Sequence, residues 1–139
     1  MFTKLLSDES TENQYCVDCG AKLQSQYDQI YVSMNHGIFL CHNCASIHQA
    51  HYGVEISFVK SISEVNESSA SLYQANKLLK LSKWTYTQLR VLIISGGNKA
   101  FLDYMDQYDL TSDTIQKRYN SVAAQYYRDH LKNKIKGGN

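Results

Sequence analysis

Four cysteines occur as two Cys-x-x-Cys pairs, and this spacing constrains the fold more than any other feature of the chain. The pairs are Cys16–Cys19 and Cys41–Cys44, and residues 20–40 separate them. Two Cys-x-x-Cys turns bring four thiolates together as the tetrahedral set that zinc accepts. Gly20 directly follows the first pair and suits a backbone that turns back past the sulfurs. The pattern predicts one structural zinc ion bound by all four cysteines.

Disulfide formation is the main alternative use of these cysteines, and the start of the chain argues against it. The first ten residues, MFTKLLSDES, are too short an apolar stretch for a secretory signal. We therefore expect a cytoplasmic protein, in whose reducing surroundings cysteines bind metal rather than pair. A mixed site that uses His42 or His48 would leave one cysteine over. Catalytic zinc would need a position open to water, which four cysteine ligands do not leave.

The composition indicates one domain with two parts. The chain has 139 residues, of which 43% are hydrophobic, enough for a core of its own. We expect a single domain over residues 1–136 and a flexible tail over 137–139. The zinc finger is expected over about 13–52 and a helical part over about 78–136.

Local patterns predict the elements of the first part. The segments QIYVSM and GIFLC are expected to form hairpin-like pieces. VEISFV (54–59) alternates apolar and polar residues, as a strand does. Ser7 is expected to cap a short first helix, because Asp8 and Glu9 suit its first turn.

The second part of the chain reads as a series of helices. A helix that includes Trp84 should end at SGGN (95–98), because glycine supplies a left-handed cap. Asn98 should start the next helix, and Ser112 should cap the one after it. A last helix is expected from Ser121 to about Lys136, and it is expected to pack through a stripe that includes Val122 and Tyr126.

The distribution of charge separates the candidate classes of partner. Residues 1–59 carry two basic and six acidic side chains, and residues 60–139 carry twelve basic and seven acidic ones, so the halves balance at −4 and +5. A GATA-like DNA-binding finger would need a basic segment after its cysteines, yet residues 45–59 hold no Lys or Arg. We therefore expect no nucleic-acid partner. The basic second half can face an acidic protein or, peripherally, an anionic membrane.

Several motifs in order resemble the Arf GTPase-activating (ArfGAP) domain family. They are CVDCG, HGIFLC followed by HNCASIHQ, GVEISFVKS, KWTYTQLRVLIISGGNKAF and KRYNSVAAQYYRDHL, and together they span roughly residues 7–135. Two insertions, in 20–30 and in about 62–77, depart from the family pattern. The resemblance implies an α+β fold in which a four-cysteine zinc finger with a small antiparallel sheet is surrounded by about five or six helices.

The resemblance also implies a function and a partner. Domains of this family bind a GTP-loaded Arf-type small GTPase and stimulate its hydrolysis of GTP, so the chain would be a GTPase activator rather than an enzyme with its own substrate. We expect a monomer that is cytoplasmic, in part on Golgi or vesicle membranes. A non-catalytic module that binds Arf as a scaffold is the alternative.

The family's catalytic arginine falls on Gln49 in this chain. That arginine follows the motif's histidine and acts as an arginine finger, a device worth about 10³–10⁵ in rate. Glutamine is neutral and has no guanidinium. Lys60 is the candidate surrogate, while His48, Ile56 and Phe58 are expected to meet the partner. His48 has a second interpretation, as a histidine that packs and hydrogen-bonds beside the metal site.

Overall fold

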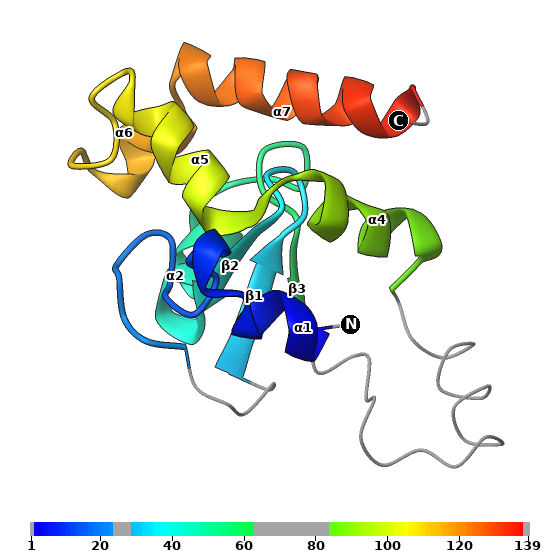
Figure 1. Ribbon diagram of the computed structural model, residues 1–139. Coiled ribbons are helices and arrows are strands. Elements are labelled where there is room, and N and C mark those ends of the chain that lie inside the picture. The colour runs from blue at the N-terminus through cyan, green and yellow to red at the C-terminus, as the bar shows by residue number, and fades with distance from the viewer. Residues whose placement is uncertain (1, 24–28, 63–83, 138–139) are drawn as a thin grey trace, which may run out of the picture.

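A three-stranded antiparallel sheet lies at the centre of the molecule. The computed structural model describes residues 2–23, 29–62 and 84–137 (Figure 1). Strands β1 (Ile30–Ser33) and β2 (Ile38–Cys41) form a hairpin, and β3 (Val59–Ser61) pairs with the other edge of β1. The strand order is therefore β2-β1-β3. The hairpin was predicted correctly, because both strands are short apolar runs separated by a polar turn.

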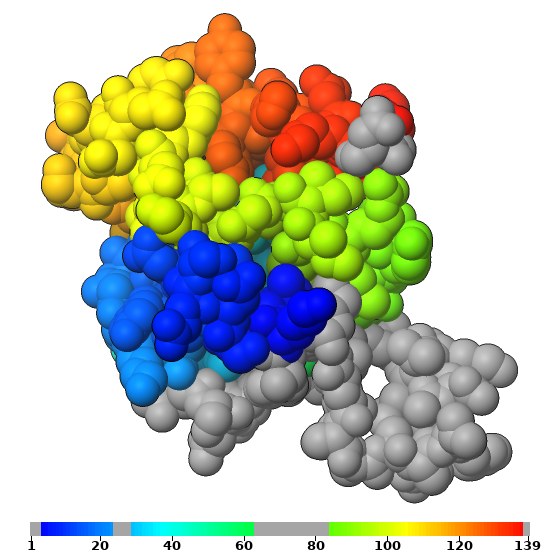
Figure 2. All heavy atoms as spheres, viewed as in Figure 1, coloured from blue at the N-terminus to red at the C-terminus, as the bar shows by residue number. Residues whose placement is uncertain are grey.

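Helices surround this sheet within the described residues. They are α1 (Phe2–Ser7), α2 (His42–His51), α4 (Tyr86–Ile94), α5 (Gly97–Asp106), α6 (Ile115–Tyr119) and α7 (Val122–Lys136), with a 3₁₀ helix η1 at Glu9–Thr11. Helix α2 packs on β1 and β2, α5 packs on β2 and η1, and α7 packs against α4 and α6. Figure 2 shows α7 along the top of the molecule, above α4 and α5. The predicted α+β architecture is confirmed.

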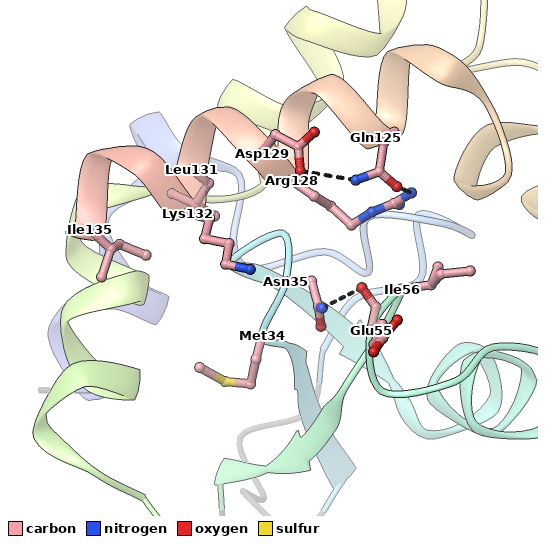
Figure 3. A pocket seen from close by; sticks show the side chains of 10 residues that line it. All are labelled: Met34, Asn35, Glu55, Ile56, Gln125, Arg128, Asp129, Leu131, Lys132 and Ile135. Atoms are coloured by element: carbon pink, nitrogen blue, oxygen red, sulfur yellow. Dashed lines mark hydrogen bonds between the residues drawn. The ribbon is translucent and has the colours of Figure 1, made fainter. Parts of the chain in front are cut away.

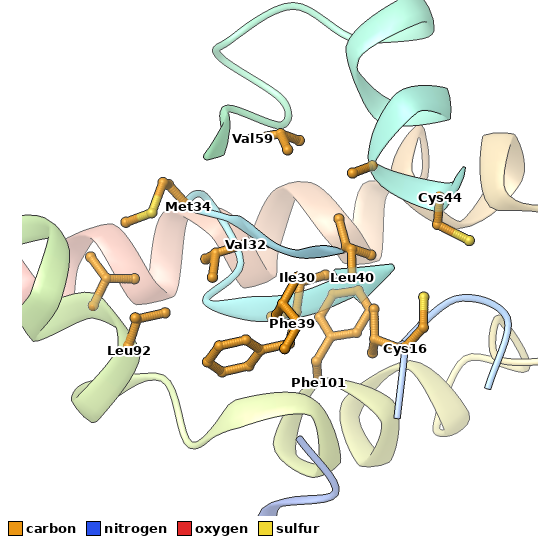
Figure 4. Close-up of a cluster of buried hydrophobic side chains, with 14 of the residues drawn as sticks. Cys16, Ile30, Val32, Met34, Phe39, Leu40, Cys44, Val59, Leu92 and Phe101 are labelled. Atoms are coloured by element: carbon orange, nitrogen blue, oxygen red, sulfur yellow. The ribbon is translucent and has the colours of Figure 1, made fainter. Parts of the chain in front are cut away.

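The core is built where the hairpin meets α5 and α6. The side chains of Ile30, Val32, Ile38 and Leu40 are at most 2% exposed. Phe39 and Phe101 are equally buried and lie beside the sheet in Figure 4, which also shows Cys16 and Cys44 at the edge of the same cluster. The cysteines of the predicted finger are therefore continuous with the main core, so the finger and the helical part fold as one unit.

Asn98 joins the finger to the helical part. Its side-chain oxygen accepts from the Phe39 amide at 2.7 Å, and its Nδ2 donates to the Tyr15 and Phe39 carbonyls. Gly96 and Gly97 precede it with φ angles of +84° and +79°, the left-handed region that favours glycine. Gly96 thus ends α4 as predicted, whereas α5 begins at Gly97 and not at Asn98, whose side chain instead hydrogen-bonds to the sheet.

Two predicted features of the first part are wrong. Residues 54–58 are not in a strand, because the Ile56 and Ser57 amides both donate to the Gly53 carbonyl and close a turn. Ser7 is the last residue of α1 rather than its cap. Asp8 instead caps η1, accepting from the Ser10 amide.

Three predicted features of the helices are also wrong. Thr114, and not Ser112, caps α6 by accepting from the Lys117 amide. Trp84 lies before α4, which starts after a capping box formed by Thr85 and Gln88. On α7 the buried side chains are Ala124, Arg128 and Leu131, whereas Val122 and Tyr126 are 72% and 66% exposed. The stripe was predicted on the wrong face of α7, because a polar side chain, Arg128, occupies the face that is buried.

Candidate metal centre and the helix that follows it

The four cysteine sulfurs form a compact cluster. All four Sγ atoms lie within 4.8 Å of one another, and the Sγ atoms of Cys19 and Cys41 are 3.7 Å apart. A tetrahedral zinc ion with bonds of about 2.3 Å sets sulfurs about 3.8 Å apart. The two Cys-x-x-Cys pairs are therefore arranged for one tetrahedral ion, and no open coordination position remains among the four ligands.

Backbone geometry holds both pairs in place. The Gly20 amide donates to the Cys16 carbonyl at 2.9 Å, and the Cys16 amide donates to the Ala21 carbonyl at 2.8 Å. Gly20 has a φ of +78°, as its predicted turn requires. Cys41 ends β2 and is the N-cap of α2, where its Sγ accepts from the Cys44 amide. The turn at the first cysteine pair and the start of α2 at the second pair thus direct all four sulfurs towards one point.

The four thiols lie so close together that they cannot all ionise without a cation among them. A hydrogen bond from Cys44 lowers the pKa of Cys16, and the same contact raises the pKa of Cys44. Burial raises the pKa of Cys41 as well. One thiolate therefore forms readily, while neighbouring negative charge opposes the others unless a metal ion neutralises them. This donor set fits zinc.

A buried carboxylate lies between the first two cysteines. The Asp18 side chain is completely buried and accepts from His48 Nε2 at 2.7 Å, Arg118 Nη1 at 2.9 Å and the Tyr119 hydroxyl at 2.6 Å. These three donors come from α2 and α6. A single carboxylate therefore ties the first metal-binding turn to two helices.

A hydrogen-bond chain continues from His48 through the sheet to α7. The His48 Nδ1 and Ser57 Oγ are 2.7 Å apart, as are the Ser57 and Ser33 hydroxyls, and Ser33 Oγ lies 2.8 Å from His36 Nδ1. Arg128 Nη1 lies 3.1 Å from His36 Nε2. Because arginine only donates, His36 Nε2 accepts and its Nδ1 carries the proton. The hydroxyls then donate in turn towards His48 Nδ1, which leaves His48 Nε2–H for Asp18.

Burial keeps the far histidine of this chain neutral. His36 is completely buried, and desolvation together with the positive charge of Arg128 holds its pKa well below the usual value. A neutral His36 is the form that the hydrogen-bond directions require. The histidines and hydroxyls of the chain are consequently all hydrogen-bonded with His36 uncharged.

The predicted site residues lie in two environments. Gln49 is exposed on α2, one residue after the fully buried His48. The His48 ring is enclosed by the core, as its second interpretation describes, and a direct contact with a partner would require it to become exposed. Ile56 is half-buried, and Phe58 is 37% exposed.

Lys60, the candidate surrogate, points into the protein. Its side chain is 4% exposed, and its Nζ donates to Gln88 Oε1 at 3.1 Å while lying 5.1 Å from the centre of the Trp84 ring. These contacts hold the ammonium against α4. Lys60 would have to leave them to reach a partner, and its surrogate role stays a prediction.

Sequence reasoning missed the residues that brace the metal turn. Asp18 and Arg118 are 100 positions apart, and their ion pair depends on the tertiary fold. The only local signal for Asp18 is a carboxylate inside a Cys-x-x-Cys turn, a position that is more often exposed. Nothing in the sequence marks His36 and Ser57 as buried, because a polar residue that becomes buried looks the same in sequence as one that stays exposed.

Replacing Asp18 with asparagine should destabilise the metal-loaded protein by roughly 3–5 kcal/mol, because it leaves the buried Arg118 without its counter-charge. Urea denaturation followed by circular dichroism gives this value from the shift in midpoint. The matched control is Asp103→Asn, since Asp103 forms an exposed pair with Lys99 and should contribute under about 0.5 kcal/mol. Equal shifts for the two variants would show that the Asp18 network does not brace the fold.

Fold and site together define a small α+β domain organised around one four-cysteine metal centre. The family model described as "Putative GTPase activating protein for Arf" matches residues 1–136. The chain therefore belongs to the ArfGAP family, as its motifs indicate.

Known proteins support this assignment. ADP-ribosylation factor GTPase-activating protein 3 of Pongo abelii is 32% identical over 120 residues, which are 86% of this chain and 19% of that protein. Stromal membrane-associated protein 1 of Homo sapiens is 35% identical over 104 residues, covering 75% of this chain and 17% of its own length. The chain thus spans about a fifth of the length of these relatives.

A solved structure shares the fold. It is the crystal structure of a "putative GTPase activating protein for ADP ribosylation factor" from Cryptosporidium parvum. Its TM-score is 0.69 with 26% sequence identity, over 96% of this chain and 87% of that one. The fold of this chain therefore also occurs in a solved relative.

Proposed function

We propose that this chain is a GTPase-activating domain that binds a GTP-loaded Arf-family small GTPase and lacks the arginine finger. One observation carries the proposal: Gln49 is exposed on α2, directly after His48 in the helix that begins at the second cysteine pair, where the family places its catalytic arginine. Family membership and the names of the relatives support the choice of partner.

The structure supports Gln49 as a rigidly presented residue. The preceding His48 is bonded on both ring nitrogens, to Asp18 and to Ser57. The Tyr52 amide closes the end of α2 on the His48 carbonyl, and the Tyr52 hydroxyl donates to the Ile115 carbonyl. The backbone beneath the exposed face of α2 is therefore held in place, so docking through that face costs little conformational entropy.

The charge of Gln49 limits what this docking can do. A glutamine amide can donate hydrogen bonds but cannot neutralise the negative charge that develops on the transferring phosphoryl group. Arg118 and Arg128 are 3% and 7% exposed and are engaged inside the domain, so neither is presented on the surface. Stimulation of hydrolysis should thus fall well below that of an arginine-finger activator.

We further propose that the metal is a single structural zinc ion and that the domain acts as a monomer. The closed four-sulfur set supports a structural rather than catalytic ion. A scaffold that binds Arf without stimulating hydrolysis is the second candidate function, and Gln49 is the observation that favours it. In the described part of the chain, no helix is long and apolar enough to cross a membrane. Peripheral attachment through the α7 lysines, on Golgi or vesicle membranes facing the cytoplasm, stays part of the proposal.

Binding to a nucleotide-loaded Arf protein tests the partner. The zinc-loaded chain should bind Arf carrying a non-hydrolysable GTP analogue at least about tenfold more tightly than Arf carrying GDP, measured by biolayer interferometry. Phe58→Ala, which trims an exposed aromatic side chain beside the turn 53–57, should weaken binding about tenfold, as loss of an aromatic contact does. The matched control is Tyr126→Ala, another exposed aromatic but on α7. No binding to either nucleotide form would refute the proposed partner.

A further inference from the structure

A cavity of about 540 Å³ lies between α7 and the turns at residues 34–37 and 53–57. Its size is within the range of small-molecule sites. Figure 3 shows Lys132 reaching from α7 towards Asn35, the Arg128 guanidinium beside Gln125 on the same helix, and Ile56 on the opposite loop. The cavity is separate from the cysteine cluster, none of whose members lines it.

Arg128 is a buried cation whose hydrogen bonds are incomplete. The side chain is 7% exposed; Nη1 donates to His36 Nε2 and to the Tyr119 carbonyl, and Nη2 donates to Gln125 Oε1. Its Nε–H is buried and has no hydrogen-bond partner. A guanidinium has five N–H groups, so the Nε–H and one Nη2–H remain unused. These adjacent nitrogens are a pair that can bind a carboxylate or phosphate through two parallel hydrogen bonds.

Within the described residues Arg128 forms no ion pair, unlike the other buried arginine; burial lowers its pKa, and the charge of nearby Asp129 offsets this in part. Arg118 donates to the Asp18 carboxylate and to three backbone carbonyls. Among the described residues, no carboxylate forms an ion pair with Arg128. An unpaired buried charge is costly, whereas pairing with an anion recovers part of that cost. The pairing of Arg118 is therefore complete, whereas that of Arg128 is not, and Arg128 lines the cavity.

The rest of the lining restricts the charge and shape of a ligand. Met34, Ile56, Leu131 and Ile135 supply apolar surface, which suits an aliphatic segment. Glu55 and Asp129 also line the cavity, and their charges would oppose a ligand with several negative groups. The exposed Gln125 amide bridges the guanidinium to Asp129, and it can swing aside to admit an anion.

We propose that this cavity binds an aliphatic carboxylate, whose single negative group pairs with Arg128 and Lys132 while its chain lies against the apolar wall. None of the four cysteines and no residue of α2 lines this cavity. It would make the domain responsive to a small amphiphilic acid.

Titration of the zinc-loaded chain with four probes tests the chemistry. Decanoate should bind with a dissociation constant of about 0.1–1 mM, as expected for a ligand of its size. Decanol lacks the carboxylate and acetate lacks the chain, so each should bind at least about tenfold more weakly. Decyl phosphate, with a larger charge, should also bind more weakly than decanoate. Isothermal titration calorimetry gives the four constants.

Nuclear magnetic resonance locates the ligand at the unpaired group. In ¹H–¹⁵N spectra, decanoate should shift the Arg128 Nε–H resonance and the backbone amides of Asn35 and Ile56. Lys132→Ala should weaken decanoate binding about three- to fivefold, as loss of one partly exposed charge contact does. The matched control is Lys134→Ala, which removes an equal charge from α7 at a position that does not line the cavity, and it should change binding by less than about twofold.

Any of three results would overturn the proposal. The first is equal binding of decanoate and decanol, which would leave the cation without a role. The second is a set of resonance shifts that omits Arg128, and the third is equal weakening by the two lysine variants; both would place the acid elsewhere on the surface.

Discussion

Removal of the metal should abolish cooperative folding of the whole domain rather than loosen one loop. Structural zinc sites contribute about 10–16 kcal/mol in zinc-finger peptides, and a domain of this size is stable by about 5–15 kcal/mol in total. Cys16 and Cys44 are part of the main hydrophobic core, so the cluster cannot open alone. Circular dichroism after treatment with a zinc chelator should show loss of the thermal unfolding transition, which returns when zinc is added back.

A pair of variants on α2 separates metal loss from a general effect of substitution. Cys44→Ser removes a buried ligand and should reproduce the unfolded state of the chelated protein. Ser46→Ala changes an exposed position of the same helix and should leave the melting temperature within a few degrees. A chelated protein with no bound zinc and an unchanged melting curve would contradict the structural role of the cluster.

Gln49→Arg should raise the single-turnover rate of GTP hydrolysis on a bound Arf protein by about 10³-fold or more. An arginine finger supplies on the order of 10³–10⁵ in rate because its guanidinium stabilises charge in the transition state. The variant should fold as the wild type does, since Gln49 is exposed on α2 and arginine and glutamine have similar helix propensities. The effect would therefore lie in the chemical step, which rapid-quench kinetics at saturating activator isolates.

Two control substitutions make the interpretation specific. Ser46→Arg adds the same charge to an exposed position of α2 one turn earlier, and it should leave the rate within a fewfold of the wild type. Gln49→Lys restores the charge without the planar guanidinium, so a smaller gain is expected. If Ser46→Arg accelerates hydrolysis as much as Gln49→Arg, general electrostatic attraction explains the gain and the docking geometry differs from the proposed one.

Local signals in the sequence accounted for the parts of the fold that depend on short-range chemistry. The spacing of the cysteines predicts a cluster because each pair shares one turn, and the sulfurs do converge. The SGGN segment predicts a helix end because glycine adopts positive φ, and Gly96 and Gly97 do so. The motif order identified the family, which the family match over residues 1–136 confirms.

Features that depend on tertiary contacts escaped prediction. The alternation in 54–59 resembles a strand, but the Gly53 carbonyl captures two amides and forms a turn. The packing stripe of α7 was misplaced because Arg128, a polar side chain, occupies the buried face. Part of the insertion in about 62–77 lies outside the described residues. The network around Asp18 joins residues far apart in sequence, which no local pattern encodes.

The loss of the arginine finger can be measured by single-turnover hydrolysis of GTP on an Arf protein, with and without saturating zinc-loaded wild-type chain. We expect the chain to bind the GTP-loaded form and to accelerate hydrolysis by less than about tenfold, because the position of the arginine finger carries a neutral Gln49. Acceleration by the wild-type chain of about 10³-fold or more would show that another residue supplies the missing charge and that Gln49 does not limit the activity.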